Sequence, residues 1–212
     1  MSHVREGRAH VSSGASRGGA AFAHPPRNIK ALGIEPAMKI ADFGAGSGAY
    51  VIAIAEHLEN SGRVYAVDIQ KDLLRRIHTE AVKRGFKNVE IVWGDLEMPE
   101  GSKIADASLD LVLISNLLFQ VEDKQAVIEE GKRVIKPGGR LAIIDWSESF
   151  GGMGPIKTAV VTKEEVLALA RESSLVFQKE FRAGAHHYGL VFRKEAGRRA
   201  IGVQSKRVTM RP

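Results

Sequence analysis

Cysteine is absent from the 212 residues of this chain. This absence excludes disulfide bonds and thiolate metal ligands. It also excludes any mechanism in which a protein thiol attacks the substrate. Binding and catalysis must therefore use other side chains.

Long apolar runs are also lacking. No run approaches the roughly 18 residues that a membrane-spanning helix needs. The first residues, MSHVREGRAHVSSGASRGG, hold no apolar segment that a signal peptide could use. We therefore expect a cytoplasmic protein. A composition of 44% hydrophobic and 26% charged residues is typical of one globular domain.

The net charge of +6 is unevenly distributed along the chain. Residues 1–30 hold five Lys or Arg and one acid, and residues 193–212 hold seven and one. The segment between them is slightly acidic. Because the Gly- and Ser-rich start lacks apolar periodicity, we expect a disordered basic tail at residues 1–21. A domain over residues 22–194 and a basic C-terminal tail over residues 195–212 complete the expected organisation.

Between the tails, short apolar runs alternate with helical stretches, which is typical of parallel strands joined by crossover helices. We expect strands at residues 39–43, 63–68, 89–93, 109–115 and 139–146, and helices at 49–58, 71–84 and 124–134. Pro137 and Gly138 should end the last of these helices and turn the chain into the strand that follows.

The pattern changes after Thr162. TKEE at residues 162–165 resembles a capping box that opens a helix to about Ser173. Two strands, at about residues 176–182 and 187–194, are separated by the turn AGAH and should form a hairpin. One edge of the sheet is then antiparallel.

A glycine-rich turn, DFGAGSG at residues 42–48, follows the first strand and opens a helix. Glycine lets the backbone approach a ligand at the positive end of a helix dipole. Asp68 ends the next strand, where a carboxylate can accept the hydroxyls of an adenosine ribose. The same spacing also satisfies a loose nicotinamide fingerprint, so these residues alone leave the nucleotide cofactor open.

Three further segments distinguish between the possible cofactors. GDLEMP (residues 94–99), SNLLFQ (115–120) and a KPGG turn (136–139) follow in order along the chain. With them, residues 22–194 resemble the class I S-adenosylmethionine-dependent methyltransferases, nearest to the ubiquinone- and menaquinone-biosynthesis branch. The resemblance implies a doubly wound, Rossmann-like α/β sheet of seven strands, mostly parallel with an antiparallel last strand. It implies S-adenosyl-L-methionine as the cofactor.

The resemblance also implies roles for particular residues. The glycine turn flanks the methionine part of the cofactor, Asp68 holds the ribose, Asp95 and Leu96 contact the adenine, and Asn116 lies beside the sulfonium. An Asp at a strand end can also simply cap a loop, so Asp95 has a second interpretation. The expected cofactor contacts are Asp42, Gly44, Ala45, Gly46, Gly48, Asp68, Ile69, Gly94, Asp95, Leu96 and Asn116.

Methyl transfer from a sulfonium needs a nucleophile held close to the methyl group and no metal. A base can assist, and the candidates are Asp145 at the end of the fifth strand and His186 or His187 in the hairpin. FAHPPR at residues 22–27 precedes the domain. Phe22 and His24 could form a lid over the cofactor, or the two prolines could make a rigid linker.

The sequence says least about the methyl acceptor. Without cysteine, thiolate addition to pyrimidines and cysteine-dependent arsenite methylation are excluded, and SNLL replaces the NPPY-type sequence of exocyclic-amine methyltransferases. We expect O-, N- or C-methylation of a small molecule. The short GGMGP stretch (residues 151–155) argues against a quinone precursor. The alternatives are an RNA- or ribosome-associated protein recruited by its basic tails and a nicotinamide oxidoreductase, although the latter's Tyr-x-x-x-Lys pair is missing.

Overall fold

A computed structural model describes residues 23–196. The expected tail at residues 1–21 and nearly all of the one at 195–212 lie outside the described residues. The strands are β1 (Lys39–Phe43), β2 (Arg63–Asp68), β3 (Val89–Trp93), β4 (Leu109–Ser115), β5 (Ile135–Trp146), β6 (Leu175–Arg182) and β7 (His187–Lys194). The helices are α1 (Pro25–Leu32), α2 (Ala49–His57), α3 (Lys71–Lys83), α4 (Lys124–Val134) and α5 (Lys163–Glu172), with short 3-10 turns η1 (Leu118–Gln120) and η2 (Lys157–Ala159).

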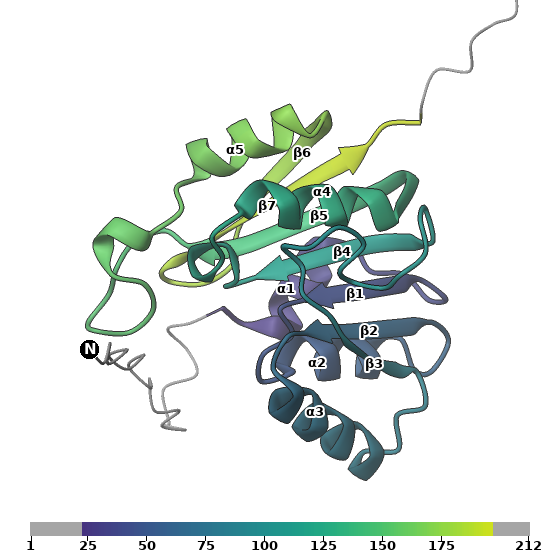
Figure 1. Ribbon diagram of the computed structural model, residues 1–212. Helices are drawn as coiled ribbons and strands as arrows, with labels where there is room; N and C mark the ends of the chain where they lie inside the picture. Colours follow the sequence, from purple (N-terminus) through teal and green to yellow (C-terminus); the bar gives the residue numbers. More distant parts are fainter. Residues whose placement is uncertain (1–22, 197–212) are drawn as a thin grey trace, which may run out of the picture.

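The strands form one seven-stranded sheet in the order β3-β2-β1-β4-β5-β7-β6 (Figure 1). Strands β1 to β5 run parallel, and β7 is antiparallel to both of its neighbours. The expected fold class is confirmed. The chain reverses its direction of winding between β1 and β4, and ligands of such sheets bind at that point, outside the carboxyl ends of the strands.

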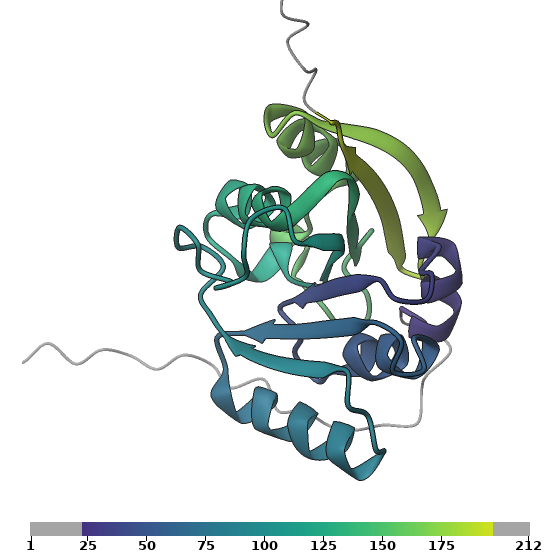
Figure 2. The same cartoon turned by 90° about the vertical axis from the view of Figure 1, so that its right-hand side faces the viewer.

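Helices cover both faces of the sheet. Buried side chains of α1, α2 and α3 pack on one face, and those of α4 and α5 pack on the other (Figures 1 and 2). The central strands are almost fully buried, as parallel strands between two helical layers should be. This double cover explains why their sequences read as nearly continuous apolar runs.

Helix α1 was not expected from the sequence, where the FAHPPR segment suggested either a lid over the cofactor or a rigid linker. Pro25 and Pro26 instead occupy the first helical turn, where a missing N–H costs nothing. The His24 side chain caps this turn, and Gly33 ends the helix in a left-handed conformation. Asn28, a buried residue of α1, donates to the Tyr50 hydroxyl at 2.7 Å and to the Ala183 carbonyl at 3.0 Å. Helix α1 therefore joins α2 to the β6–β7 turn (Figure 2).

The KPGG segment also differs from its prediction. Helix α4 ends at Val134 as expected, but β5 begins at once, at Ile135, rather than after the glycines. The pairing with β4 shifts from Leu109 opposite Ile135 to Leu111 opposite Arg140. Pro137 is tolerated because the intervening residues bulge out of the ladder, where its missing N–H is not needed.

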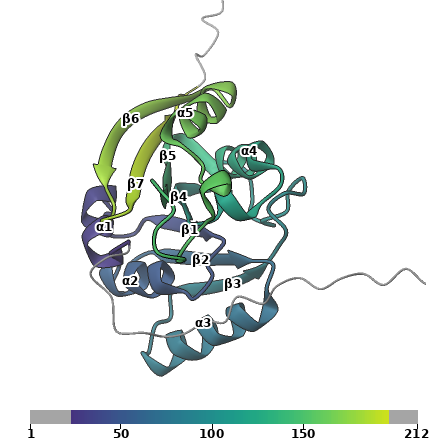
Figure 3. The same ribbon diagram turned by 90° about the vertical axis from the view of Figure 1, so that its left-hand side faces the viewer.

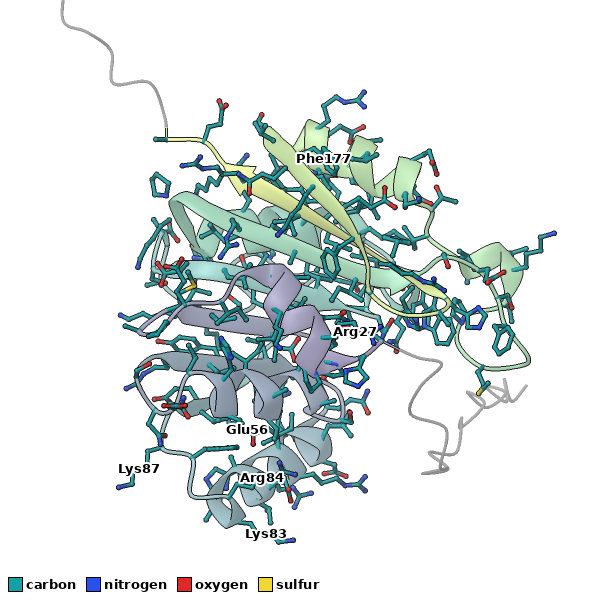
Figure 4. All side chains as sticks on the ribbon, turned by 180° about the vertical axis from the view of Figure 1, so that it is seen from behind. Arg27, Glu56, Lys83, Arg84, Lys87 and Phe177 are labelled. Atoms are coloured by element: carbon teal, nitrogen blue, oxygen red, sulfur yellow. The ribbon has the colours of Figure 1, made fainter. Side chains whose placement is uncertain are left out.

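Strands β3 and β6 form the two edges of the sheet. Phe177 lies on β6 at one end, and Lys83 and Arg84 lie at the end of α3 at the other (Figure 4). Arg84 pairs with Glu80 one turn back at 2.6 Å. Over residues 23–196, none of the helices has both the length and the apolar character needed to cross a membrane.

Candidate functional site

The turn between β1 and α2 has the shape that only glycine permits at two positions. Gly44 and Gly48 have φ angles of +72° and +80°. A Cβ atom on Gly44 would lie 2.8 Å from the Leu117 side chain, and one on Gly48 would lie 2.6 Å from Ile77. Both positions therefore combine a left-handed backbone with close packing.

Four backbone amides of this turn donate hydrogen bonds within the protein. Gly44 and Ala45 donate to the Val67 carbonyl at 2.9 and 3.0 Å, and Gly48 donates to Ala45 at 2.8 Å. Gly46 donates to the Asp68 carboxylate. The sequence suggested amides that approach a ligand. In the structure, the absent Cβ atoms of Gly44 and Gly48 also make room for the Leu117 and Ile77 side chains, which pack against the turn.

Asp68 ends β2 beside this turn. One carboxylate oxygen accepts the Gly46 N–H at 2.9 Å, and the other accepts the Gln70 N–H at 2.8 Å. Each oxygen keeps a further lone pair for a ligand hydroxyl. The next residue, Ile69, exposes 55% of its surface, which is unusual for a large aliphatic side chain next to a buried strand.

A cleft of about 410 Å³ opens above the carboxyl ends of β1, β4 and β5, a volume that suits a small-molecule ligand. It lies beside the glycine turn, and α1 closes one side of it. Its lining residues are Ala23, Pro25, Asp42, Gly44, Ala45, Gly46, Ser47, Ala49, Tyr50, Ser115, Asn116, Gln120, Trp146 and His187.

Several buried polar atoms around the cleft have no hydrogen-bond partner. They include the Asp42 Oδ1 and Asn116 Oδ1 atoms. Burial, with a smaller contribution from the charge of Asp68, raises the pKa of Asp42 to about 8. Buried polar atoms are rarely left unpaired, so this cluster indicates that a polar ligand completes the site.

Asn116 is held in an unusual conformation at the end of β4. Its φ of +54° lies in the left-handed region, and its N–H donates to the Ile144 carbonyl of β5 at 2.9 Å. Asparagine tolerates this conformation better than most side chains. The SNLLFQ segment therefore contributes two amide residues, Asn116 and Gln120, to the region above β4.

Asp95 and Leu96 follow β3, farther along the same edge of the sheet. One Asp95 oxygen accepts the Glu97 N–H at 3.1 Å, which is the loop-capping role that the sequence left open. Leu96 is buried. Gly94 packs against the Gly101 carbonyl, where a Cβ atom would lie at 2.1 Å. None of these three residues lines the 410 Å³ cleft.

His187 is the one base candidate that lines the cleft. Its side chain is 3% exposed, and neither ring nitrogen has a hydrogen-bond partner. The ring lies 4.2 Å from the Trp146 ring, centroid to centroid. Burial, with a smaller contribution from His186, lowers the pKa of His187 to about 4. The imidazole is therefore neutral near pH 7 and can accept a hydrogen bond, and its lowered pKa makes it a weaker base than a free imidazole.

The other two base candidates lie outside the cleft lining. Asp145 is buried on the opposite face, where it accepts the Leu118 and Trp146 N–H groups, and burial raises its pKa to about 7. His186 lies near Glu148, 2.7 Å from Nδ1 to the carboxylate, and stacks on Phe150. Through its hydrogen bond from the Leu118 N–H, Asp145 supports the segment that follows Asn116.

Sequence reasoning did not single out several lining residues. Tyr50, Gln120 and Pro25 are the clearest examples. A lone tyrosine in the otherwise aliphatic first turn of α2, two residues after Gly48, was an available signal. Pro25 gave no such signal, because its position depends on α1, a helix that precedes the alternating strands and helices of the sheet.

The strand order, the antiparallel β7, the glycine turn and the acid at the end of β2 together define a class I S-adenosylmethionine-dependent methyltransferase fold. The family model described as "Methyltransferase domain" matches residues 34–179. The chain belongs to this methyltransferase family. The resemblance expected from the sequence is confirmed.

Curated relatives show which branch is near. The chain is 31% identical over 121 residues to a demethylmenaquinone methyltransferase of Anoxybacillus flavithermus, a match that covers 57% of this chain and 49% of the relative. It is 30% identical over 128 residues to that of Bacillus velezensis, covering 59% and 53%. The chain thus spans about half the length of the curated relatives it matches.

Solved structures agree on the fold. An S-adenosylmethionine-dependent methyltransferase of Aquifex aeolicus superimposes with a TM-score of 0.73 at 25% identity, covering 80% of this chain and 88% of the other. The [4+2]-cyclase SpnF superimposes with a TM-score of 0.68 at 16% identity, covering 81% of each chain. At that identity the likeness shows the fold alone, and the fold by itself does not dictate a reaction.

Proposed function

We propose that this chain binds S-adenosylmethionine in the cleft above β1 and β4 and transfers its methyl group to a small molecule. The observation that carries the proposal is the set of unpartnered buried polar atoms around the glycine turn, led by the Asp42 and Asn116 oxygens. The cofactor's ammonium and sulfonium are cations and would pair with such oxygens. Residues 22–194 form the proposed methyltransferase domain.

The residues present fit this cofactor along its length. Asp42 can accept from the ammonium of the methionine part, and Asp68 has lone pairs left for the ribose hydroxyls. Asp95 would accept the adenine amino group. Exposed Ile69 and the backbone around Leu96 would cover the adenine ring, which accounts for an aliphatic side chain left open to solvent.

The bound cofactor supplies an electrophilic methyl group whose carbon–sulfur bond breaks with its electron pair left on sulfur. The protein's part is to hold the acceptor in line, exclude water and receive a proton. His187 is placed for the proton: its neutral imidazole lines the cleft and has both nitrogens free of hydrogen bonds. An acceptor O–H or N–H would donate there as its lone pair bonds to the methyl carbon.

A small acceptor is favoured because the site is a hollow and not a flat surface. The cleft that His187 lines has a volume of about 410 Å³, a size that suits a small ligand. The relatives methylate demethylmenaquinone, as their names state. That substrate is one candidate here, although the segment of residues 147–162 between β5 and α5 is short.

Transfer of labelled methyl groups tests the proposal. The purified chain and labelled S-adenosylmethionine are incubated with a cell extract separated into small-molecule, RNA and protein fractions. We expect protein-dependent label in the small-molecule fraction and its loss with Asp68→Ala. Label confined to RNA or protein would contradict a small acceptor, and no label in any fraction would contradict methyl transfer.

A further inference from the structure

Strand β3 is an open edge of the sheet, and α3 runs beside it (Figure 3). The Asn88 carbonyl accepts a hydrogen bond from β2 at 2.8 Å, and the Gly94 N–H donates one to β2 at 3.2 Å. Alternate residues of a strand direct their backbone groups to the same side. Val89, Ile91 and Trp93 therefore direct theirs away from β2, where no strand of residues 23–196 pairs with them.

The opposite edge of the sheet is protected against strand pairing, whereas β3 is not. Strand β6 has a register shift between Phe177 and Lys179, and bulges and lysines hinder pairing at an edge. Strand β3, with the sequence VEIVW, has no lysine, no proline and no register shift against β2. Its one charged residue, Glu90, forms an ion pair with Arg63 of β2. An extended segment can therefore pair with the free edge of β3.

A hollow of about 480 Å³ lies between this edge and α3. Ile91 packs in the same apolar cluster as Leu74 of α3, so both lie on one face of the sheet. Trp93, two residues farther along β3, faces the same way and is 45% exposed. A strand added beside β3 would therefore direct alternate side chains toward this hollow. Its lining residues are Lys71, Leu74, Arg75, His78, Thr79, Ile91 and Trp93.

The rim of the hollow is positively charged. The Nζ atoms of Lys71 and Lys103 lie 4.8 and 4.3 Å from the centre of the Trp93 ring. Neither lysine forms an ion pair within residues 23–196. Arg75 pairs with Asp72, which offsets one charge, and no acidic residue of the described chain lines the hollow. Because the two ammonium groups near one ring repel each other, a carboxylate beside them would be stabilising.

The charge also distinguishes between possible occupants. Antiparallel pairing of two β3 strands about a two-fold axis would bring two basic rims to the same face of the joined sheet, where they would repel. The ends of this chain are themselves basic, with five Lys or Arg and one acid in residues 1–30 and seven and one in residues 193–212. An acidic segment of another protein fits the edge and the rim together.

We propose that β3 and α3 form a docking groove for a partner protein, which adds an extended segment with alternating apolar and acidic side chains as an eighth strand. Main-chain hydrogen bonds to Val89, Ile91 and Trp93 would supply affinity, and the basic rim would select carboxylates. The groove and the cofactor cleft share no lining residue. The inference therefore goes beyond the proposed function and does not depend on it.

Synthetic peptides test the proposal on the full chain by fluorescence anisotropy. The probes are fluorescein-labelled EVEVEVE, its basic counterpart KVKVKVK, and two forms of EVEVEVE that carry N-methyl groups either on every Val or on every Glu. An N-methyl group removes a backbone donor and blocks strand pairing on its own side. A labelled uridine oligonucleotide of the same charge as EVEVEVE tests a nucleic acid as the alternative partner.

We expect EVEVEVE to bind about tenfold more tightly than KVKVKVK. One pattern of methylation should weaken binding about tenfold and the other should be tolerated, because only one set of peptide amides faces β3. Lys71→Glu should weaken binding about fivefold. Lys83→Glu, at an exposed lysine of α3 outside the hollow, should have no effect. Bound EVEVEVE should also slow hydrogen exchange at the Ile91 and Trp93 amides.

Urea denaturation first confirms that both variants are folded. No binding of EVEVEVE, or binding as tight as that of KVKVKVK, would overturn the proposal. Equal effects of the two methylation patterns would exclude strand pairing, and equal effects of the two lysine variants would exclude the groove. Tighter binding of the oligonucleotide than of EVEVEVE would point to a nucleic-acid partner instead. None of these results would alter the proposed methyl transfer, which has its own test.

Discussion

The Asp68 carboxylate accepts the Gly46 N–H at 2.9 Å and so joins the end of β2 to the glycine turn that follows β1. The acid and the turn, twenty-odd residues apart in sequence, form one unit. A substitution at Asp68 should therefore affect both the shape of the turn and any ligand above it.

Asp68→Asn tests this double role. The amide keeps one acceptor oxygen but turns the other position into a donor, which faces an N–H group. We expect the affinity for S-adenosylhomocysteine to fall at least tenfold and the free energy of unfolding to fall by about 1–2 kcal/mol. Calorimetry and urea denaturation measure the two effects. Asp72→Asn, an exposed acid on α3, is the control and should change neither by much.

Gly44→Ala separates backbone strain from crowding. Gly44 and Gly152 share a φ of +72°, but a Cβ atom at Gly44 would lie 2.8 Å from Leu117, while one at Gly152 would have no atom within 4 Å. Gly152→Ala should cost about 1 kcal/mol of stability from strain alone. Gly44→Ala should cost at least 1 kcal/mol more and weaken cofactor binding. Equal losses for the two variants would show that Leu117 moves freely.

Asp42 should link cofactor binding to pH. Its pKa of about 8 means that it is largely protonated at pH 7 in the free protein. A bound cation favours the carboxylate, so binding should release a proton and the affinity should rise with pH up to about 8. Calorimetry in buffers of different ionisation enthalpy counts the proton. An affinity that is independent of pH between 6 and 8 would refute this account.

The same raised pKa affects folding. A carboxyl group whose pKa is higher in the folded protein than in the unfolded protein, where it is 3.8, stabilises the folded state. This stabilisation is complete at a pH below 3.8. The contribution is lost as pH rises from about 4 toward 8. Asp42→Asn should flatten this part of the stability profile and raise the free energy of unfolding at pH 8 by a few kcal/mol. Urea denaturation of both proteins from pH 5 to pH 8 checks the sign.

His187→Gln tests the proton-accepting role. Glutamine can still accept a hydrogen bond but cannot take the proton. We expect kcat to fall about 10²- to 10³-fold with the natural acceptor, with the affinity for S-adenosylhomocysteine within threefold of the unaltered value. His186→Gln is the control, since that ring faces Glu148 outside the cleft. A similar loss of kcat in both variants would argue against His187 as the proton acceptor.

Asn28 should hold α1 against the cleft. Its amide bridges Tyr50 and Ala183, so Asn28→Ala removes two buried hydrogen bonds. We expect a loss of about 2–3 kcal/mol in stability and weaker cofactor binding. Tyr50→Phe removes only the hydroxyl. If the two residues act together, the double variant will bind the cofactor no more weakly than Asn28→Ala alone, whereas additive losses would show that they act separately.

The sequence predicted the sheet well because parallel strands buried on both faces are nearly continuous apolar runs. It predicted β7 and the end of α4 at Val134 from local turn signals. It missed α1 because proline at the start of a helix and proline in a linker look the same without the surrounding contacts. It also placed the start of β5 too late, since a bulge that holds Pro137 interrupts the apolar pattern.

The sequence also predicted part of the candidate site. Asp42 lies near the end of β1, and the glycines and Asn116 follow strand ends, so their convergence on one edge follows from the fold. The sequence did not predict that His187 lines the cleft while its neighbour His186 lies outside the lining. Alternate residues of a strand face opposite ways, but which of the two faces the cleft depends on the exact register of β7 against β5.

The binding of S-adenosylhomocysteine, compared with that of NAD, tests the central claim most directly. By calorimetry we predict a dissociation constant on the micromolar scale for S-adenosylhomocysteine, about −8 kcal/mol, and no detectable heat with NAD. Asp68→Ala should remove most of the binding. Tight binding of NAD without binding of S-adenosylhomocysteine would contradict the account.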